Sequence, residues 1–214
     1  MHIPDGFLSP QTYLPAYGVA ALAWTWAARG VRQVLDDEVI PRLATMTALA
    51  YGLSLVMVPI PGGTSGHVVG VAMLALLFGM RLAFLAYSLV LVLQSLLLGA
   101  GGMTALPVNA LAMGLIGAVM ARLVFRCLSG WHQDFAVLVA AWVSVVAAAL
   151  VVALVLGAQP LLAHRSDGTP LFFPFGWRIT LPAVVIPHLI VGIGEAMLTM
   201  LVWRFAKTRH WDVI

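Results

Sequence analysis

Long apolar runs recur along the whole of this 214-residue chain, and no polar stretch is long enough to form a separate soluble domain. Hydrophobic residues make up 62% of the sequence and charged residues only 9%, whereas the surface of a soluble domain needs far more charge. The runs are continuous rather than alternating, which disfavours a β-barrel. The sequence therefore predicts a single all-α integral membrane domain over residues 1–214.

A helix needs about 20 apolar residues to cross a bilayer. Runs separated by glycine, proline or charge predict a bundle of about seven transmembrane helices, the third short enough to be packed inside the protein. The predicted segments are Tyr13–Ala28, Val39–Val58, Val68–Met80, Leu82–Leu98, Leu106–Leu128, Phe135–Leu156 and Leu181–Phe205. We expect Thr64–His67 to be loop-like and Gly157–Ile179 to form a longer polar and aromatic loop.

The 11 lysines and arginines predict the orientation of the bundle. If successive segments alternate across the membrane, nine of these residues fall on one side, and only Arg165 and Arg178 fall on the other. Basic residues gather on the cytoplasmic side, so we expect a cytoplasmic C-terminus and an N-terminus outside. This arrangement places His2, His67 and the loop Gly99–Ala105 on the same outer face. The charges indicate membrane orientation and no nucleic-acid partner.

The start of the chain, Met1-His2-Ile3-Pro4-Asp5-Gly6-Phe7, is a candidate metal site. It lacks the basic first region of a signal peptide, and the large His2 favours retention of Met1. The amine of Met1 and the amide and imidazole of His2 can close two fused chelate rings in one plane. Such a set suits Ni(II) or Cu(II), and it can also take Co(II).

One in-plane position of that chelate stays open, and His67 is the candidate to fill it. The glycines just before His67 allow the backbone to approach a ligand closely. We therefore assign residues 1–12 as a metal-binding N-terminal segment and residues 59–67 as a metal-binding loop. The alternatives are a disordered terminus for His2 and a helix-capping or hydrogen-bonded loop histidine for His67.

Six further polar residues are candidates for a shell around the metal rather than for ligands. They are Asp5, Thr64, Ser65, Asn109, His188 and Glu195. We expect Asp5 to brace the N-terminal turn. His188 and Glu195 lie seven residues apart, so they share one face of the last segment, where they form either a polar lining or a hydrogen-bonded core pair. Asn109 either orients an outer loop or satisfies backbone groups at a helix start.

Two motifs together resemble the CbiM/NikM family, the substrate-binding membrane subunits of energy-coupling factor transporters for cobalt and nickel. They are the opening Met1–Pro10 and the segment Pro61–His67, and the resemblance extends through most of the chain. It implies that the amine of residue 1, the amide and imidazole of His2, and the imidazole of His67 hold the metal. It does not choose between Ni(II) and Co(II).

The resemblance also implies partners: a transmembrane coupling subunit, cytoplasmic ATPase subunits and a small accessory membrane subunit. Related transporters dock the coupling subunit on an alanine-bearing face of the first helix. That face corresponds here to Ala16, Ala20, Ala23 and Ala27, which ordinary packing within the chain would also explain.

Absent motifs narrow the function further. The sequence has no Gly-x-x-x-x-Gly-Lys-Ser/Thr phosphate loop, so ATP hydrolysis has to come from a partner. It also has no His-Glu-x-x-His motif of a zinc protease. We predict a non-enzymatic importer subunit of the bacterial inner membrane that captures Ni(II) or Co(II) outside. The rival functions are a metal-dependent intramembrane enzyme, with Glu195 as its only deep carboxylate, and a structural subunit that binds no metal.

Overall fold

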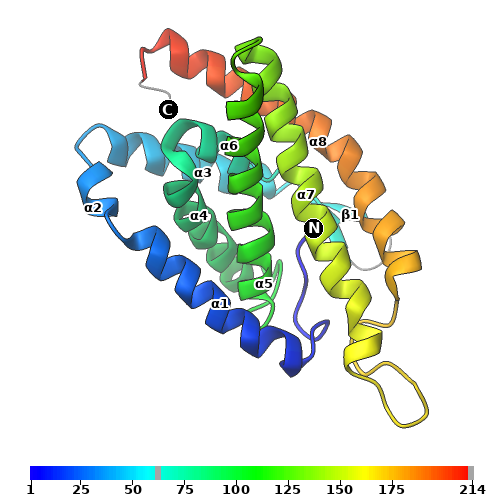
Figure 1. The fold of residues 1–214 in the computed structure, drawn as a ribbon. Coiled ribbons are helices and arrows are strands. Elements are labelled where there is room, and N and C mark those ends of the chain that lie inside the picture. The colour runs from blue at the N-terminus through cyan, green and yellow to red at the C-terminus, as the bar shows by residue number, and fades with distance from the viewer. Residues whose placement is uncertain (61–63, 212–214) are drawn as a thin grey trace.

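Helices account for nearly all of the regular structure in the computed structural model (Figure 1). It describes residues 1–60 and 64–211, without the side chains of residues 60, 64 and 65, so the middle of the predicted metal-binding loop lies outside the described residues. The elements are α1 (Pro10–Ala28), α2 (Val31–Val34), α3 (Val39–Ser54), β1 (Val58–Ile60), β2 (Thr64–Gly66), α4 (Val71–Leu98), α5 (Leu106–Asn109), the π-helical segment η1 (Ala110–Ile116), α6 (Gly117–Leu128), α7 (Gln133–Leu162) and α8 (Trp177–Thr208).

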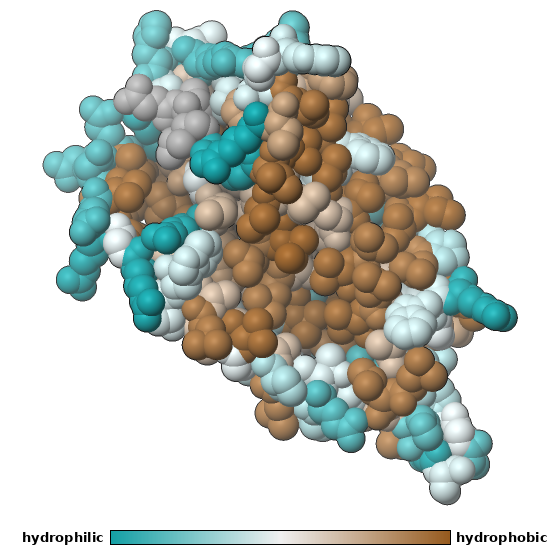
Figure 2. Space-filling model, viewed as in Figure 1, coloured by the Kyte–Doolittle hydropathy of each residue, from teal (hydrophilic) through white to brown (hydrophobic). Residues whose placement is uncertain are grey.

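Four helical stretches in the described part of the chain are long and apolar enough to cross a membrane. They are α4, the continuous stretch Leu106–Leu128 formed by α5, η1 and α6, then α7 and α8. Apolar side chains cover the centre of the face shown in Figure 2, and hydrophilic side chains gather toward its ends. The chain is thus an integral membrane protein, and the count of seven segments stays a prediction.

The predicted loop Gly157–Ile179 is too long, because α7 continues to Leu162 and α8 already begins at Trp177. Gly157 lies inside α7 as a packing position rather than a helix end. A Cβ atom there would lie 2.3 Å from the Trp177 ring, and the Trp177 indole donates a hydrogen bond to the Leu154 carbonyl at 2.8 Å. A glycine that makes room for a neighbouring ring was misread as a helix breaker.

The segment around residue 60 also differs from the prediction. α3 ends at Ser54 rather than Val58, and β1 and β2 form a short antiparallel hairpin in which Val58 faces Gly66. The loop-like interpretation of Thr64–His67 was therefore wrong for Thr64–Gly66. Backbone pairing between two three-residue strands leaves no clear periodic signal in the sequence.

Helix α4 consists of two helical parts separated at Gly79, whose φ of 82° and ψ of 163° lie outside the helical region. This backbone conformation is essentially restricted to glycine. The break falls next to the predicted boundary at Met80 and Arg81. It supports the division of this stretch into a short first helix and a longer second one.

The alanine-bearing face of α1 is largely covered by the chain itself. Ala20 and Ala27 have no exposed surface, and the Trp24 indole of α1 donates a hydrogen bond to the Ser88 hydroxyl of α4 at 2.9 Å. The packing explanation therefore describes Ala20 and Ala27, and a docking role for the face stays a prediction.

Candidate metal centre

The first residues of the chain run into the interior of the bundle. Met1 and Ile3 have no exposed surface, and His2 is only 3% exposed. The Asn109 side chain binds the Ile3 backbone twice: its carbonyl oxygen accepts from the Ile3 N–H and its amide donates to the Ile3 carbonyl, both at 3.0 Å. Asn109 pairs with both backbone groups of Ile3, as a neighbouring β-strand would. These two bonds hold the N-terminal segment in place and thereby fix the position of His2.

Asp5 ties the same segment to the loop that follows α4. Its carboxylate accepts hydrogen bonds from the N–H groups of Met103 and Thr104, at 3.1 and 2.8 Å, and from the Thr104 hydroxyl. Burial raises the pKa of Asp5, but these hydrogen bonds outweigh it and hold that pKa below its usual value. The structure thus places Asp5 as a brace at the edge of the site, away from the two histidines.

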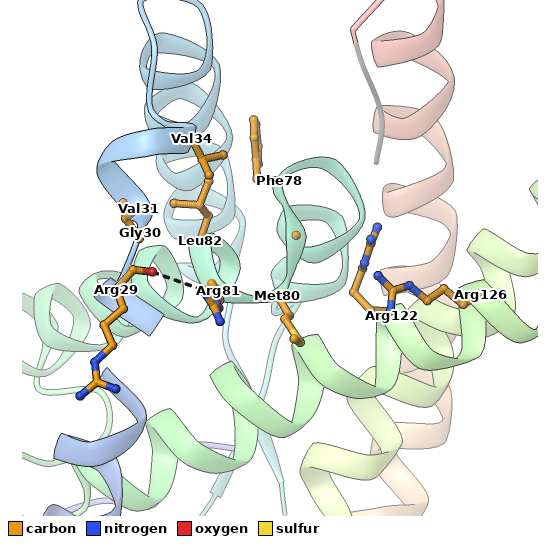
Figure 3. A pocket seen from close by; sticks show the side chains of 11 residues that line it. Arg29, Gly30, Val31, Val34, Phe78, Met80, Arg81, Leu82, Arg122 and Arg126 are labelled. Atoms are coloured by element: carbon orange, nitrogen blue, oxygen red, sulfur yellow. Dashed lines mark hydrogen bonds between the residues drawn. The ribbon is translucent and has the colours of Figure 1, made fainter. Parts of the chain in front are cut away.

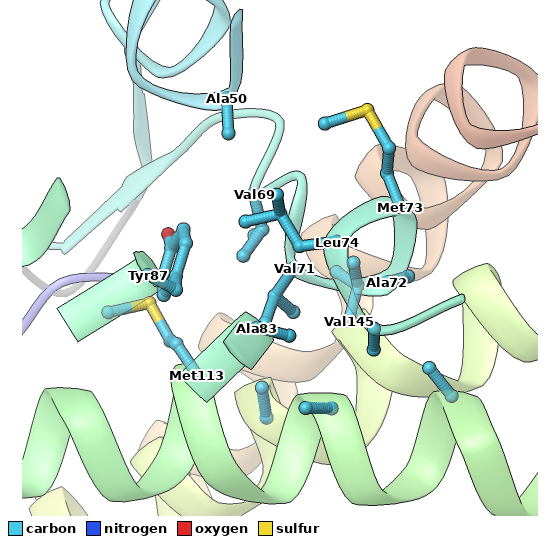
Figure 4. Close-up of a cluster of buried hydrophobic side chains, with 14 of the residues drawn as sticks. Ala50, Val69, Val71, Ala72, Met73, Leu74, Ala83, Tyr87, Met113 and Val145 are labelled. Carbon is cyan, nitrogen blue, oxygen red and sulfur yellow. The ribbon is translucent and has the colours of Figure 1, made fainter. Parts of the chain in front are cut away.

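Glu195 on α8 anchors the segment that carries His67. One carboxylate oxygen accepts from the Val69 N–H at 2.8 Å and the other from the Gly70 N–H at 2.7 Å, with Glu195 fully buried. Figure 4 shows Val69 among the buried side chains around Ala50 and Met73. The backbone just after His67 is therefore fixed by a side chain that is distant in sequence.

His2 and His67 come together inside the bundle although 65 residues separate them. His2 Nδ1 lies 3.1 Å from His67 Nε2, and the ring centroids are 4.5 Å apart with their planes inclined by 18°. His67 is 4% exposed, so this contact is shielded from water. The sequence-predicted pair therefore meets at the two nitrogens that a shared cation would need.

A chain of hydrogen bonds determines which nitrogen of His2 carries its proton. The Ser54 hydroxyl donates to the Tyr51 carbonyl at 2.6 Å, so the Ser54 oxygen accepts from the Gln94 amide group at 2.5 Å. The carbonyl oxygen of Gln94 then faces His2 Nε2 at 2.9 Å and accepts a hydrogen bond from its N–H. A neutral His2 consequently presents a lone pair at Nδ1.

The tautomer of His67 is fixed in the same way. His67 Nδ1 lies 2.8 Å from the Val68 carbonyl, which can only accept a hydrogen bond. His67 Nε2 therefore also presents a lone pair, and it faces the lone pair of His2 Nδ1. Two such nitrogens repel each other unless a cation lies between them or one outer hydrogen bond is given up to supply a proton.

The N-terminal amine adds a third nitrogen donor. Burial lowers the pKa of the Met1 amine from 8.0 to about 4. Burial also lowers the pKa of His67 to about 3 and that of His2 well below 6.5, with further lowering from the charges of nearby groups. Within the described residues, neither the Met1 amine nor the His2 N–H has a hydrogen-bond partner. The amine and both imidazoles are thus neutral at neutral pH.

His188 supplies a further bare nitrogen near this centre. Its Nδ1 donates to the Val184 carbonyl at 2.7 Å, while its Nε2 is buried and has no partner in the described structure. The pKa of His67 is lowered mainly by burial, and the charge that His188 would carry on protonation lowers it further. His188 and Glu195 each bind backbone and not each other, so the described structure shows no hydrogen-bonded core pair.

Sequence reasoning missed Gln94 and Ser54. A glutamine within the apolar stretch Leu82–Leu98 is the available signal, because a buried amide needs hydrogen-bond partners. The side chains of Thr64 and Ser65, predicted to surround the metal, lie outside the described residues. Within the described ranges, no group of three His, Cys, Asp or Glu side chains is arranged to hold a metal ion.

Gln94 offers a direct test of this arrangement. Replacing Gln94 by leucine removes the acceptor that holds His2 Nε2–H, so His2 loses its fixed tautomer and orientation. We expect nickel affinity to fall about 10- to 100-fold, as for other residues that orient a ligand. Equilibrium dialysis of purified protein measures this, and Gln133→Leu at the exposed start of α7 is the matched control. Equal affinities for both variants would contradict the assigned tautomers.

Comparisons with known proteins place the whole chain in one group. A probable fused nickel transport protein, LarMN, of Lactiplantibacillus plantarum is 39% identical over 97% of this chain and 64% of its own length. A fused nickel transport protein, NikMN, of Rhodobacter capsulatus is 32% identical over 93% of this chain and 59% of its own length. The chain thus spans less than two thirds of these two fused relatives.

A solved structure has the same fold. The crystal structure of a truncated transition metal transporter superimposes with a TM-score of 0.94 at 37% identity, covering 98% of this chain and all of that one. The family model described as the cobalt uptake substrate-specific transmembrane region matches residues 2–213. The chain therefore belongs to the CbiM family.

Proposed function

We propose that this protein is the substrate-binding membrane subunit of an importer for Ni(II) or Co(II). The substrate ion would be held by the Met1 amine, the His2 amide nitrogen and Nδ1, and His67 Nε2. One observation carries the proposal: two buried imidazole nitrogens lie 3.1 Å apart, and the other nitrogen of each ring faces a carbonyl acceptor, so the two facing nitrogens are the ones left with lone pairs. His2 Nδ1 is also the nitrogen that closes the fused chelate rings with the amide and the amine.

The spacing of the two nitrogens agrees with a shared metal ion. Metal–nitrogen bonds of about 2.0–2.1 Å separate adjacent nitrogens by roughly 2.8–3.0 Å in a square plane and roughly 3.3–3.4 Å in a tetrahedron. The observed 3.1 Å lies between the two values. The rigid fused chelate, rather than this spacing, favours the planar ions over Zn(II).

Metal retention by purified variants separates this proposal from its rivals. We expect His2→Ala and His67→Ala to lose bound nickel, because each removes a ligand, whereas the exposed control His164→Ala retains it. A structural subunit would tolerate all three changes. The enzyme alternative is disfavoured because both Glu195 oxygens accept backbone hydrogen bonds, so neither is positioned to activate water.

Proton release gives a second test, because metal ligands must be deprotonated. At pH 7 the amine and both imidazoles are already neutral, so only the His2 amide proton leaves. We expect about one proton per nickel ion for the protein. The free peptide of residues 1–7 should release more, because its amine has an ordinary pKa near 8. Calorimetry in buffers of different ionisation enthalpy measures both values, and equal release would contradict the buried neutral amine.

The same pKa shift sets the pH dependence of stability without metal. The amine pKa is about 4 in the folded chain and 8.0 as its ordinary value, so the unfolded chain binds more protons between these limits. Stability of the metal-free protein should therefore increase as pH rises through that window and fall as pH drops. Thermal unfolding of the metal-free protein at several pH values checks the direction.

The transport cycle extends the proposal to partners. ATP-driven uptake would need a transmembrane coupling subunit and cytoplasmic ATPases, since this sequence has no phosphate loop. The distribution of basic residues supports outer capture in the bacterial inner membrane, with the N-terminus outside and the C-terminus in the cytoplasm. Labelling of single-cysteine variants in intact cells, after Cys127 is replaced, tests the orientation. Reactivity at the α4–α5 loop and protection of the C-terminus are expected.

A further inference from the structure

The proposed ligands are closed off from water. Met1 has no exposed surface, and His2 and His67 are only 3% and 4% exposed. The cavity drawn in Figure 3 has a volume of about 270 Å³ and lies between the end of α1, α2, the break in α4 and α6, and none of these three residues lines it. A metal ion can therefore reach or leave the ligands only when part of the chain moves.

The segment that carries His67 is held firmly. Both oxygens of the buried Glu195 side chain accept hydrogen bonds from its backbone, at Val69 and Gly70. A Cβ atom at Gly70 would lie 2.8 Å from the Cβ atom of Ala50, so this backbone also packs directly against α3. Movement here would leave a buried carboxylate without partners, which is costly. The mobile part is therefore expected on the N-terminal side.

Residues 7–9 of the N-terminal segment are fixed to α7 and to the connection between α7 and α8. The rings of Phe7 and Phe173 pack with their centroids 5.4 Å apart, and the Phe7 carbonyl accepts a hydrogen bond from the Phe173 N–H at 3.3 Å. Phe173 is 2% exposed. The Ser9 N–H donates to the buried Gln159 side chain of α7 at 2.9 Å. These contacts are shielded from water, so this part of the segment is expected to open rarely.

Residues 1–5, which we call the tip, are held at one end by a contact that water can reach. The exposed Asp5 carboxylate accepts hydrogen bonds from the N–H groups of Met103 and Thr104 and from the Thr104 hydroxyl. The α4–α5 loop fits closely around this carboxylate, because a Cβ atom at Gly102 would overlap it. Hydrogen bonds exposed to water mark the regions of a protein that open most readily. The Asp5 contact is therefore the place where the segment can start to open.

Gly6 joins the tip to the fixed residues and has the properties of a hinge. Its φ of 84° lies in the left-handed region that favours glycine. Gly6 is exposed, and beyond its two chain neighbours no heavy atom would lie within 4 Å of an added Cβ atom. Rotation about this backbone is thus free of local obstruction, whereas the proline ring restricts Pro4 and packing holds Phe7.

We propose that the tip is the entrance of the metal site, which swings about Gly6 and is latched closed by the contact of Asp5 with the α4–α5 loop. This inference rests on the proposed function, because the swing admits an ion only if Met1 and His2 are its ligands. Asp5 acts through the position of the tip and does not bind the ion.

The swing takes the proposed donor set apart and reassembles it around the ion. The segment passes between α5 and α7 (Figure 1), and opening breaks the two hydrogen bonds between Ile3 and Asn109 of α5. The amine and the His2 ring then leave His67 together, because they lie on the same side of the hinge. Closure returns them to an imidazole that has stayed in place.

Acylation of the Met1 amine by a small activated ester tests the swing without metal, because the buried amine can react only when the tip is open. Lys207 carries the only other primary amine, so peptide mass spectrometry separates the two products. We expect Asp5→Ala to raise the acylation rate about 10-fold, since it removes several exposed hydrogen bonds. Asp167→Ala is the matched control, because this exposed carboxylate accepts from the Thr169 N–H in its own loop.

Amide hydrogen exchange of the metal-free full chain locates the hinge. The N–H groups of Ile3 and Ser9 each donate to a buried side-chain amide, of Asn109 and Gln159 respectively. After correction for intrinsic rates, we expect Ile3 to exchange at least about 10-fold faster than Ser9, because only Ile3 lies on the swinging side.

A second pair of variants addresses the hinge itself. Gly6→Ala strains the closed backbone without filling any space, so it should also raise the acylation rate several-fold. Gly6→Asn should raise it less, because asparagine tolerates positive φ better than alanine. Thermal unfolding of the metal-free variants confirms that each fold is intact.

Nickel exchange connects the latch with metal capture. Asp5 holds the tip closed both with and without the ion, so Asp5→Ala should raise the association and dissociation rates alike, each about 10-fold. The equilibrium affinity should then change less than about threefold. Rapid filtration of purified protein with radioactive nickel measures both rates. A residue that only positioned the ligands would raise the dissociation rate alone.

Three results would overturn the proposal. Unchanged acylation in Asp5→Ala would show that this contact does not latch the tip. Equal exchange of Ile3 and Ser9 would show that the whole segment leaves together and would remove the hinge. A dissociation rate that rises alone would make Asp5 a ligand-positioning residue. If the wild-type chain bound no nickel, the proposed function would fail, while acylation and hydrogen exchange would still decide whether the tip swings.

Discussion

A single glycine placed before Met1 is expected to abolish high-affinity nickel binding. The added residue converts the Met1 amine into an amide and moves the new amine away, which breaks one of the two fused chelate rings. Met1 and its amine are fully buried, so there is no room for an added residue. The N-terminal segment must therefore also move out of its buried position. We expect affinity to fall at least about 1,000-fold, or roughly 4 kcal/mol. Equilibrium dialysis with radioactive nickel gives the measurement.

The control for this experiment uses the same cleavable leader, cut so that Met1 is again the first residue. Intact mass of both preparations establishes where each chain starts. A C-terminal extension of one glycine provides a second control, because it leaves the amine of residue 1 and both imidazoles unchanged. If the extended protein binds nickel as tightly as the control, the amine is not a ligand and the proposed donor set fails.

Replacing Glu195 by alanine is expected to cause the largest loss of stability. The change leaves the N–H groups of Val69 and Gly70 without acceptors in a buried setting. Each unsatisfied group costs about 1–3 kcal/mol, and the deleted side chain also leaves a cavity. We expect a total loss of roughly 3–6 kcal/mol on the same basis. Thermal unfolding of the detergent-purified, metal-free protein measures it.

Glu195→Gln is the matched variant, because it keeps the volume and one acceptor oxygen. It should lose about half as much stability, since its amide group confronts one of the two N–H groups. Both variants should also bind nickel more weakly, because the segment after His67 is no longer held. An alanine variant that unfolds at the wild-type temperature would show that water replaces the carboxylate, and that Glu195 does not anchor this segment.

The two imidazoles could be predicted from the sequence because their chemistry is local. A histidine in second position carries its own chelate with it, and the glycine-rich context of His67 is visible without any knowledge of the fold. The positive-inside count added that both residues belong on one face. Their 3.1 Å approach could not be derived in this way, because it depends on how α4, α5 and α8 pack.

The surrounding polar residues were harder to interpret. The roles of Gln94 and Glu195 depend on partners 92 and 126 residues away, and no periodic pattern reports such distant pairings. Asn109 was recognised as polar, but not as the residue that binds the Ile3 backbone on both sides. His188 and Glu195 do share a helix face as predicted, and each has found a separate backbone partner.

The helix ends were also predictable where a local sequence signal sets them, and not where a contact with a distant residue does. The break at Gly79 was located to within a residue or two, because glycine and arginine interrupt an apolar run. The end of α7 was misplaced because Gly157 lies within the helix, where its lack of a side chain makes room for the Trp177 ring of α8. A glycine that is required by packing against a distant residue cannot be told from a helix end when only the sequence is known.

The anchoring of the segment after His67 by α8 has a consequence for biosynthesis. The N–H groups of Val69 and Gly70 find their acceptors only when Glu195 on the last long helix is in place, about 125 residues further along the chain. The backbone beside His67 therefore lacks these partners while the preceding helices insert. The proposed pairing of His2 with His67 is for this reason expected to form late in synthesis rather than piece by piece.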